Sequence, residues 1–152
     1  MDSGVHTIES SVDAFSSFLL PRGFKWVSLD RIEPRDLEEL PSDEEFKKMR
    51  KEDMAAGMEL LRSRILPDIQ RNPNAIGSDY FWEIDQQEGR MGVYSLKNVY
   101  DAYFGGERIR FEPPDRDGYY RIDHGKHRIK LALEYGWTMV PAILQPTSYR
   151  RR

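Results

Sequence analysis

Apolar residues recur at helical spacing over several stretches of the chain, and segments rich in proline, glycine and charged residues separate them. Over residues 42–69 the large apolar positions lie mainly three to five residues apart, and Ser42 with Glu45 forms the sequence pattern of a capping box. The stretches 7–20 and 95–104 show the same periodicity, the second one behind a serine and ahead of two glycines. The pattern therefore predicts a short leading helix, a long helix and a third, shorter helix.

Shorter runs rich in β-branched and aromatic residues favour strands. Residues 25–29 and 80–84 are two such runs. In 108–112 and 119–123, apolar and charged residues alternate on either side of a turn, which predicts a hairpin with one core face. The final run, 139–144, contains a proline. Because proline cannot donate to a central ladder, we expect a strand that begins near this residue or lies at a sheet edge.

A last helix is predicted over residues 126–135, where Gly136 follows as a typical C-terminal cap. Its apolar positions Ile129, Ala132 and Leu133 are spaced so that they share one face, while charged residues occupy the opposite face. We therefore expect this helix to pack on the sheet through these apolar side chains.

The composition is that of one globular domain. The chain has 152 residues, of which 39% are hydrophobic and 32% charged, and a chain of this length usually folds around a single hydrophobic core. We therefore expect a single α+β domain over residues 1–152, with a small mixed sheet flanked by helices. The net charge is −3, whereas a protein that coats duplex DNA needs a strong positive field over its footprint, which argues against non-specific duplex binding.

Several kinds of chemistry and location are disfavoured by what the sequence lacks. It contains no cysteine, which excludes disulfides, thiolate metal sites and thiol nucleophiles. No apolar run approaches the roughly 20 residues that span a bilayer, and the pattern of a signal peptide is missing. We therefore expect a cytoplasmic protein that is not bound to a membrane.

A candidate anion site stands where the second hairpin strand meets the last helix. Gly125 would let the backbone approach an anion closely, and the start of a helix offers unpaired N–H groups and the positive end of its dipole. Arg128 could grip a phosphate with two hydrogen bonds, Lys126 adds a point charge, and His127 can exchange a proton near neutral pH. From the residues alone two interpretations stay open: a phosphate-binding turn, or a solvated and charged helix start.

The order of residues in this region resembles the signature of ParB/sulfiredoxin-like domains. From Tyr120 to Arg128 the chain reads Tyr-x-Ile-x-x-Gly-x-His-Arg, and an apolar helix that ends in glycine and a Val-Pro-Ala strand follow. The segment 26–34 resembles the family's opening strand and its Ile-x-Pro turn. The resemblance implies a domain core made of 25–36 and 108–145, into which a helical segment at about 42–71 is inserted.

The resemblance also implies a ligand and roles for particular residues. In this family the turn and the helix bind nucleotide phosphates, so a nucleotide (ATP or CTP) and Mg²⁺ are the expected cofactors. His124 stands where the family often has Asp or Asn, which moves the expected metal ligand to the residue before it. The residues assigned in this way are Gly125, Lys126, His127 and Arg128 for phosphate or nucleotide binding, His127 and Asp36 for catalysis, and Asp123 for a metal.

The superfamily includes nucleotide-dependent segregation proteins, sulfiredoxins, serine kinases, nuclease-like domains and toxin modules, so the fold alone does not fix the activity. A sulfiredoxin activity is excluded because Lys126 stands where that enzyme has its cysteine. One hypothesis is therefore an enzyme that acts on phosphoryl groups, either a phosphotransferase or a nuclease-like phosphodiesterase. The alternative is a non-catalytic module that binds a nucleotide or nucleic acid and controls assembly, as a homodimer or with a protein partner.

Overall fold

In the computed structural model of the protein, residues 17–46 and 49–146 are described. The strands are β1 Lys25–Ser28, β2 Arg110–Phe111, β3 Ile122–His124 and β4 Met139–Leu144. The α-helices are α2 Pro34–Glu38, α3 Lys51–Leu60, α4 Leu66–Ile69, α5 Ser78–Glu88, α6 Leu96–Phe104 and α7 Lys126–Glu134. The short 3-10 and π segments are η1 Leu29–Arg31, η2 Asp43–Glu45, η3 Leu61–Ile65 and η4 Gly92–Tyr94. The helix expected at 7–20 lies mostly outside the described residues.

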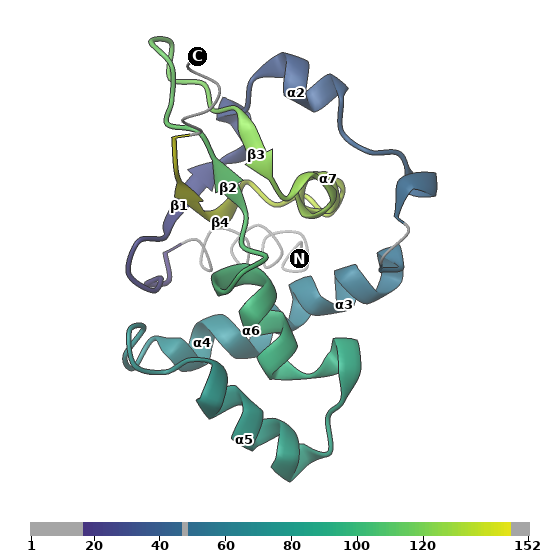
Figure 1. The fold of residues 1–152 in the computed structure, drawn as a ribbon, viewed down its shortest axis with the longest axis vertical. Coiled ribbons are helices and arrows are strands. Elements are labelled where there is room, and N and C mark those ends of the chain that lie inside the picture. The colour runs from purple at the N-terminus through teal and green to yellow at the C-terminus, as the bar shows by residue number, and fades with distance from the viewer. Residues whose placement is uncertain (1–16, 47–48, 147–152) are drawn as a thin grey trace, which may run out of the picture.

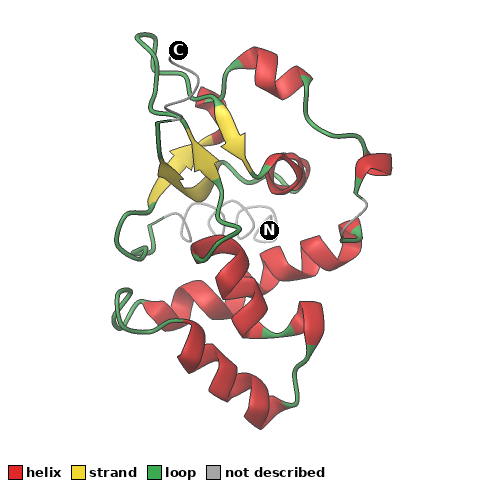
Figure 2. Cartoon of the chain, in the orientation of Figure 1, coloured by secondary structure: helices red, strands yellow, loops and turns green. Residues whose placement is uncertain are grey.

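Helices and strands are both present, which confirms the α+β class (Figure 2). The sheet has four strands in the order β1-β4-β2-β3. It lies with α7 in the upper half of Figure 1, and α3 to α6 form the lower half. Within the described part of the chain, no helix combines the length and the apolar character that crossing a bilayer requires.

The sheet is mixed, as expected. β4 pairs antiparallel with β1 and parallel with β2, and β2 pairs antiparallel with β3. The predicted hairpin between 108–112 and 119–123 is therefore confirmed in its pairing, although its strands are shorter than expected.

The last strand is confirmed as β4 and begins near Pro141, two residues before it. The alternative of an edge strand is wrong, because β4 occupies an interior position in the sheet. The hydrogen bonds explain how a proline fits there. The N–H groups of Ile143 and Gln145 donate to carbonyls on the β2 side. Pro141 lies two residues before Ile143, so its nitrogen faces the same side, at a level that β2 does not reach. The missing N–H therefore removes no bond of the ladder.

The long predicted helix exists but begins later than expected. Ser42 and Glu45 do form the capping box, yet they cap only the short η2 segment, and α3 starts at Lys51. From there the chain stays helical through η3 and α4, and Gly57 does not break it. The π turn of η3, in which the Leu66 N–H donates to the Leu61 carbonyl, directly precedes Pro67 and loosens the helix where a proline would otherwise clash.

The predicted strand at 80–84 is wrong, since these residues lie in α5. Helical spacing places Phe81 and Asp85 on one face, and both are buried. The Asp85 carboxylate accepts hydrogen bonds from the N–H groups of Leu96 at 2.7 Å and Lys97 at 2.9 Å, which begin α6. Burial and this cap therefore override the β-propensity of the aromatic run.

The third helix is confirmed as α6. The Ser95 hydroxyl accepts a hydrogen bond from the Asn98 N–H at 3.1 Å, as an N-cap should. The helix ends at Phe104 and Gly105 caps it, as the two glycines that follow the helix in the sequence indicated.

The last helix, α7, is also confirmed, but it is rotated relative to the expected orientation. Its buried apolar residues are Ile129, Leu131 and Ala132, whereas Leu133 is 39% exposed. Successive residues turn by about 100° around a helix axis, so Arg128 lies between Leu131 and Ala132 on the inward face. The helix is turned so that Arg128, and not Leu133, faces the interior.

This rotation predicts which leucine of α7 supports the fold. Leu131→Ala should lower the free energy of unfolding by about 2–5 kcal/mol, because it leaves a cavity in the core. The matched change Leu133→Ala should lower it by less than about 1 kcal/mol, because that side chain already contacts water. Urea unfolding of both variants measures the difference, and equal losses would show that the rotation is wrong.

Candidate functional site

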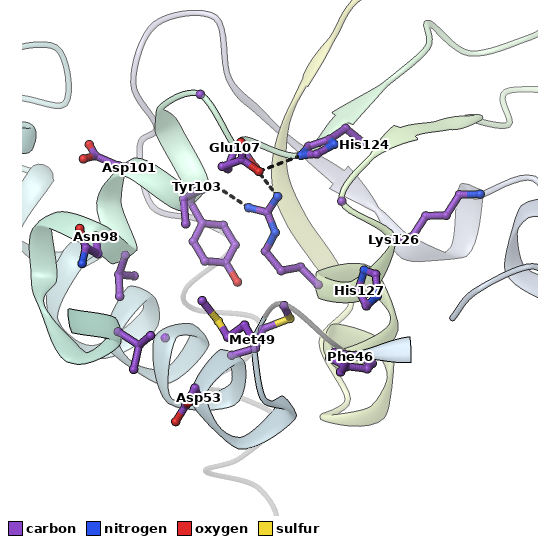
Figure 3. A pocket seen from close by; sticks show the side chains of 18 of the residues that line it. Phe46, Met49, Asp53, Asn98, Asp101, Tyr103, Glu107, His124, Lys126 and His127 are labelled. Atoms are coloured by element: carbon purple, nitrogen blue, oxygen red, sulfur yellow. Dashed lines mark hydrogen bonds and ion pairs between the residues drawn. The ribbon is translucent and has the colours of Figure 1, made fainter. Parts of the chain in front are cut away.

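A cavity of about 930 Å³ opens beside the start of α7. Its walls come from the end of β3 and α7, from α6 and the residues that follow it, and from α3 and the segment before it (Figure 3). All four residues assigned to phosphate binding, Gly125, Lys126, His127 and Arg128, line it. Its volume lies within the range of about 300–1,000 Å³ that is common for small-molecule sites.

Gly125 is required by the backbone at the point where β3 turns into α7. Its φ is +109°, a conformation that L side chains rarely adopt, and a Cβ there would lie 2.9 Å from Cγ1 of Ile109. In the part of the chain that the structure describes, no side chain caps the start of α7. The first N–H groups of this helix and the positive end of its dipole therefore face the cavity region without a protein carboxylate or hydroxyl as cap.

Lys126 is the first residue of α7. Its ammonium makes no ion pair with the described residues, and its side chain extends away from those of Tyr103 and Glu107 (Figure 3). An unpaired cation at a helix start stays available for an anion that binds at the rim of the cavity.

Arg128 is engaged with the protein itself. Its two terminal nitrogens donate to the backbone carbonyls of Ala102, in the last turn of α6, and of Glu107, in the loop that follows. The guanidinium lies 5.2 Å from the centroid of the Tyr103 ring, and burial lowers the pKa of Arg128 from its ordinary value. Because both nitrogens of a two-pronged grip are in use, the predicted phosphate contact of Arg128 would have to compete with these carbonyls.

His127 is also fixed by protein contacts. Its Nε2–H donates to the Glu45 carbonyl at 3.0 Å, and its ring meets the Phe46 ring edge to face, with centroids 4.7 Å apart. These contacts hold the segment before α3 against the start of α7. An ion-pair network adds to this, since the Lys51 ammonium lies 2.9 Å from Asp43 and 2.8 Å from Glu134 of α7.

Asp36, the predicted base, is not among the residues that line the cavity. Its side chain is buried, and its Oδ2 accepts hydrogen bonds from the Ile122 N–H at 2.8 Å and from Nε of Arg121 at 3.1 Å. Asp36 thus ties α2 to the start of β3. The structure gives it a clear stabilising contact and does not bring it together with His127.

Asp123, the predicted metal ligand, does line the cavity, but Nε of Arg110 lies 3.1 Å from its carboxylate. In residues 17–46 and 49–146 no group of three His, Asp or Glu side chains could hold a metal ion. A metal site made by the protein alone does not fit these residues. A Mg²⁺ ion that arrived with a nucleotide would take most of its ligands from phosphates and water.

Sequence reasoning missed the pair His124 and Glu107. In the cavity, Nε2 of His124 lies 3.6 Å from a carboxylate oxygen of Glu107, whose backbone carbonyl accepts from Arg128. Burial, with the nearby Arg128 and Arg110, lowers the pKa of His124, and Glu107 opposes this shift. The only sequence signal was the position of His124 directly before Gly125, and nothing in the sequence placed Glu107 near it.

Comparisons of the chain with protein-family models, with curated proteins and with solved structures found no match.

The contacts of Arg128 predict a structural effect of its removal. Arg128→Ala should lower the free energy of unfolding by about 2–3 kcal/mol, because two carbonyls lose a charged donor. Arg128→Lys should recover only part of this, since an ammonium cannot reproduce the planar two-nitrogen contact. Thermal unfolding of both variants tests this, and an unchanged melting temperature for Arg128→Ala would show that the two bonds contribute nothing.

The surroundings of His124 predict its titration. In NMR spectra its pKa should lie below the ordinary value of about 6.5, and Glu107→Gln should lower it further, because the carboxylate favours the imidazolium form. Arg110→Gln should raise it. Below about pH 6.5 the unfolded chain binds the proton more readily, so the free energy of unfolding should fall as the pH drops towards the folded-state pKa of His124. A midpoint above 6.5 would contradict the described surroundings.

Proposed function

We propose that the chain binds a phosphate-bearing ligand, a nucleotide or a nucleic-acid phosphate, in the cavity beside α7. One observation carries the proposal: the uncapped start of α7, entered through Gly125 in a left-handed conformation, opens at the wall of a cavity of ligand size. Free N–H groups at a helix start are a common phosphate-binding arrangement. The resemblance to ParB/sulfiredoxin-like domains supports the same location.

In this proposal the phosphate accepts hydrogen bonds from the first N–H groups of α7 and pairs with the Lys126 ammonium. The helix dipole favours negative charge at this position. Arg128 contributes mainly by fixing the wall of the cavity, because its terminal nitrogens already donate to carbonyls. The net charge of −3 makes a compact ligand a better fit than a long nucleic acid, whose binding relies on many cations.

A second candidate is turnover at the same site, as a phosphotransferase or a phosphodiesterase. His124 favours it, because a histidine with a lowered pKa is neutral near pH 7 and can accept a proton. The residues first assigned to catalysis support turnover less, since the His127 Nε2–H is used by Glu45 and Asp36 lies outside the cavity lining. Binding without turnover is therefore the better supported of the two functions.

Lys126 provides the test of the proposed site. Lys126→Ala should weaken the binding of ATP, CTP and pyrophosphate about tenfold, the equivalent of about 1.4 kcal/mol, because one charge-assisted contact is lost. Lys25→Ala, an exposed lysine of β1 outside the cavity, is the matched control and should leave binding unchanged. Calorimetric titrations with and without Mg²⁺ measure these affinities.

Absence of binding by the unaltered protein, or equal effects of the two lysine variants, would overturn the site. Release of inorganic phosphate in the same samples would favour turnover, whereas saturable binding without product would favour a binding module.

A further inference from the structure

The cavity has a second end, away from the start of α7, whose walls are apolar. Met54 and Val99 line this end, together with Gly57 in the middle of α3. The helical half of the molecule supplies it, whereas the sheet and α7 supply the charged end (Figures 1 and 3). A single cavity thus joins a cationic helix start to an apolar chamber.

Gly57 is an unusual residue for its position. Glycine is the least favourable residue after proline in the interior of a helix, yet α3 runs through Gly57 without a break. Its backbone does not demand glycine, because Gly57 is not among the residues with positive φ. Packing does not demand it either, since a Cβ there would meet only Cγ2 of Val99, at an ordinary 3.7 Å. The space in front of Gly57 belongs to the cavity, and a larger side chain would fill it.

Polar groups stand at the edges of this apolar end. Asp53 and Asp101 line the cavity, and each has a cationic partner outside it, Arg50 and Lys97 respectively. The Asp53 carboxylate also accepts a hydrogen bond from the Tyr94 hydroxyl at 3.0 Å, whereas the Asp101 carboxylate is paired with Lys97. A carboxylate has more acceptor sites than one partner uses, so Asp101 in particular can accept from a bound group. A bound group that fits here therefore needs apolar faces and N–H donors at its edge. An alkyl chain would place hydrocarbon against these carboxylates, which is unfavourable.

We infer that the ligand is a mononucleotide whose base lies in the chamber in front of Gly57, while its phosphates lie at the start of α7. This inference rests on the proposed function and adds the class of ligand to it. A nucleobase has the required flat faces, which contact methionine sulfur and aromatic edges well, and N–H groups at its rim. The helical segment that interrupts the predicted domain core would thus provide base binding.

Two kinds of probe test the two ends of the cavity separately. Pyrophosphate carries the phosphates alone, and ATP, CTP, GTP and UTP carry them with a base. Among the four nucleotides, the one that the unaltered protein binds most tightly should bind at least about tenfold more tightly than pyrophosphate. This is the ratio expected when a second group is buried. Equal affinities would overturn the base chamber and leave the phosphate site intact, whereas no binding of any probe would overturn the proposed function itself.

Variants of α3 test the chamber directly. Gly57→Leu should abolish the advantage of the nucleotide over pyrophosphate while pyrophosphate binding persists. Glu52→Leu places the same side chain on the exposed side of α3 and should change neither affinity. Gly57→Ala, which the structure accommodates, should raise the melting temperature of the free protein. A Gly57→Leu variant that folds and binds the nucleotide like the unaltered protein would contradict the inference.

A measurement on the unaltered protein removes any dependence on the folding of variants. In methyl NMR spectra, the methyl signal of Met54, which lines the cavity, should shift with the nucleotide and not with pyrophosphate. Met58 lies one turn later, is 3% exposed and does not line the cavity, so its signal should stay in place with both probes. If the chemical shift of the Met54 methyl group does not change at a saturating nucleotide concentration, the inference is overturned.

Discussion

The two halves of the molecule are joined by a cation that has no carboxylate partner within hydrogen-bonding distance among residues 17–46 and 49–146. Arg128 lies on the inward face of α7, and its guanidinium donates to one carbonyl in the last turn of α6 and to another in the following loop. A cation at this end of a helix is favourable because it faces the negative end of the helix dipole. The orientation of α7 and the position of the loop that carries Glu107 both depend on this contact. The shape of the cavity between the halves depends on it in turn.

Within the motif that suggested phosphate binding, some residues fix the structure of the site and another is free to bind a ligand. Gly125 is fixed by its φ and by the lack of room for a side chain beside Ile109, His127 by Glu45, and Arg128 by two carbonyls. The Lys126 side chain makes no ion pair or hydrogen bond with the described residues. The residues that fix the site are therefore distinct from the Lys126 ammonium, which is free to bind a ligand. A precise binding site requires such fixed surroundings.

How much the sequence predicts depends on the range of the signal. Ser95, with its hydroxyl on the N–H three residues later, and Gly136, with its positive φ, act locally, and the helices they bound were predicted correctly. The aromatic run at 80–84 was misassigned, because Asp85 binds the start of α6, outside the run itself, and makes α5 necessary. The inward face of α7 was misjudged because a charged Arg128 lies on it. The cavity could not be predicted at all, since its walls come from segments that only the fold brings together.

The pairing of β1 with β4 has a consequence for the way the chain reaches this fold. Lys25 lies opposite Ala142, so the strand pair joins residues near the two ends of the described chain. Bringing such distant segments together costs loop-closure entropy, whereas the contacts of α6 with α3 and α5 link segments that are closer in sequence. The helical half can therefore gain much of its stability early, and the sheet must wait for the last strand to leave the site of synthesis. The two carbonyls that accept from Arg128, one on α6 and one in the loop after it, belong to this early part of the chain and precede α7, which completes the cavity.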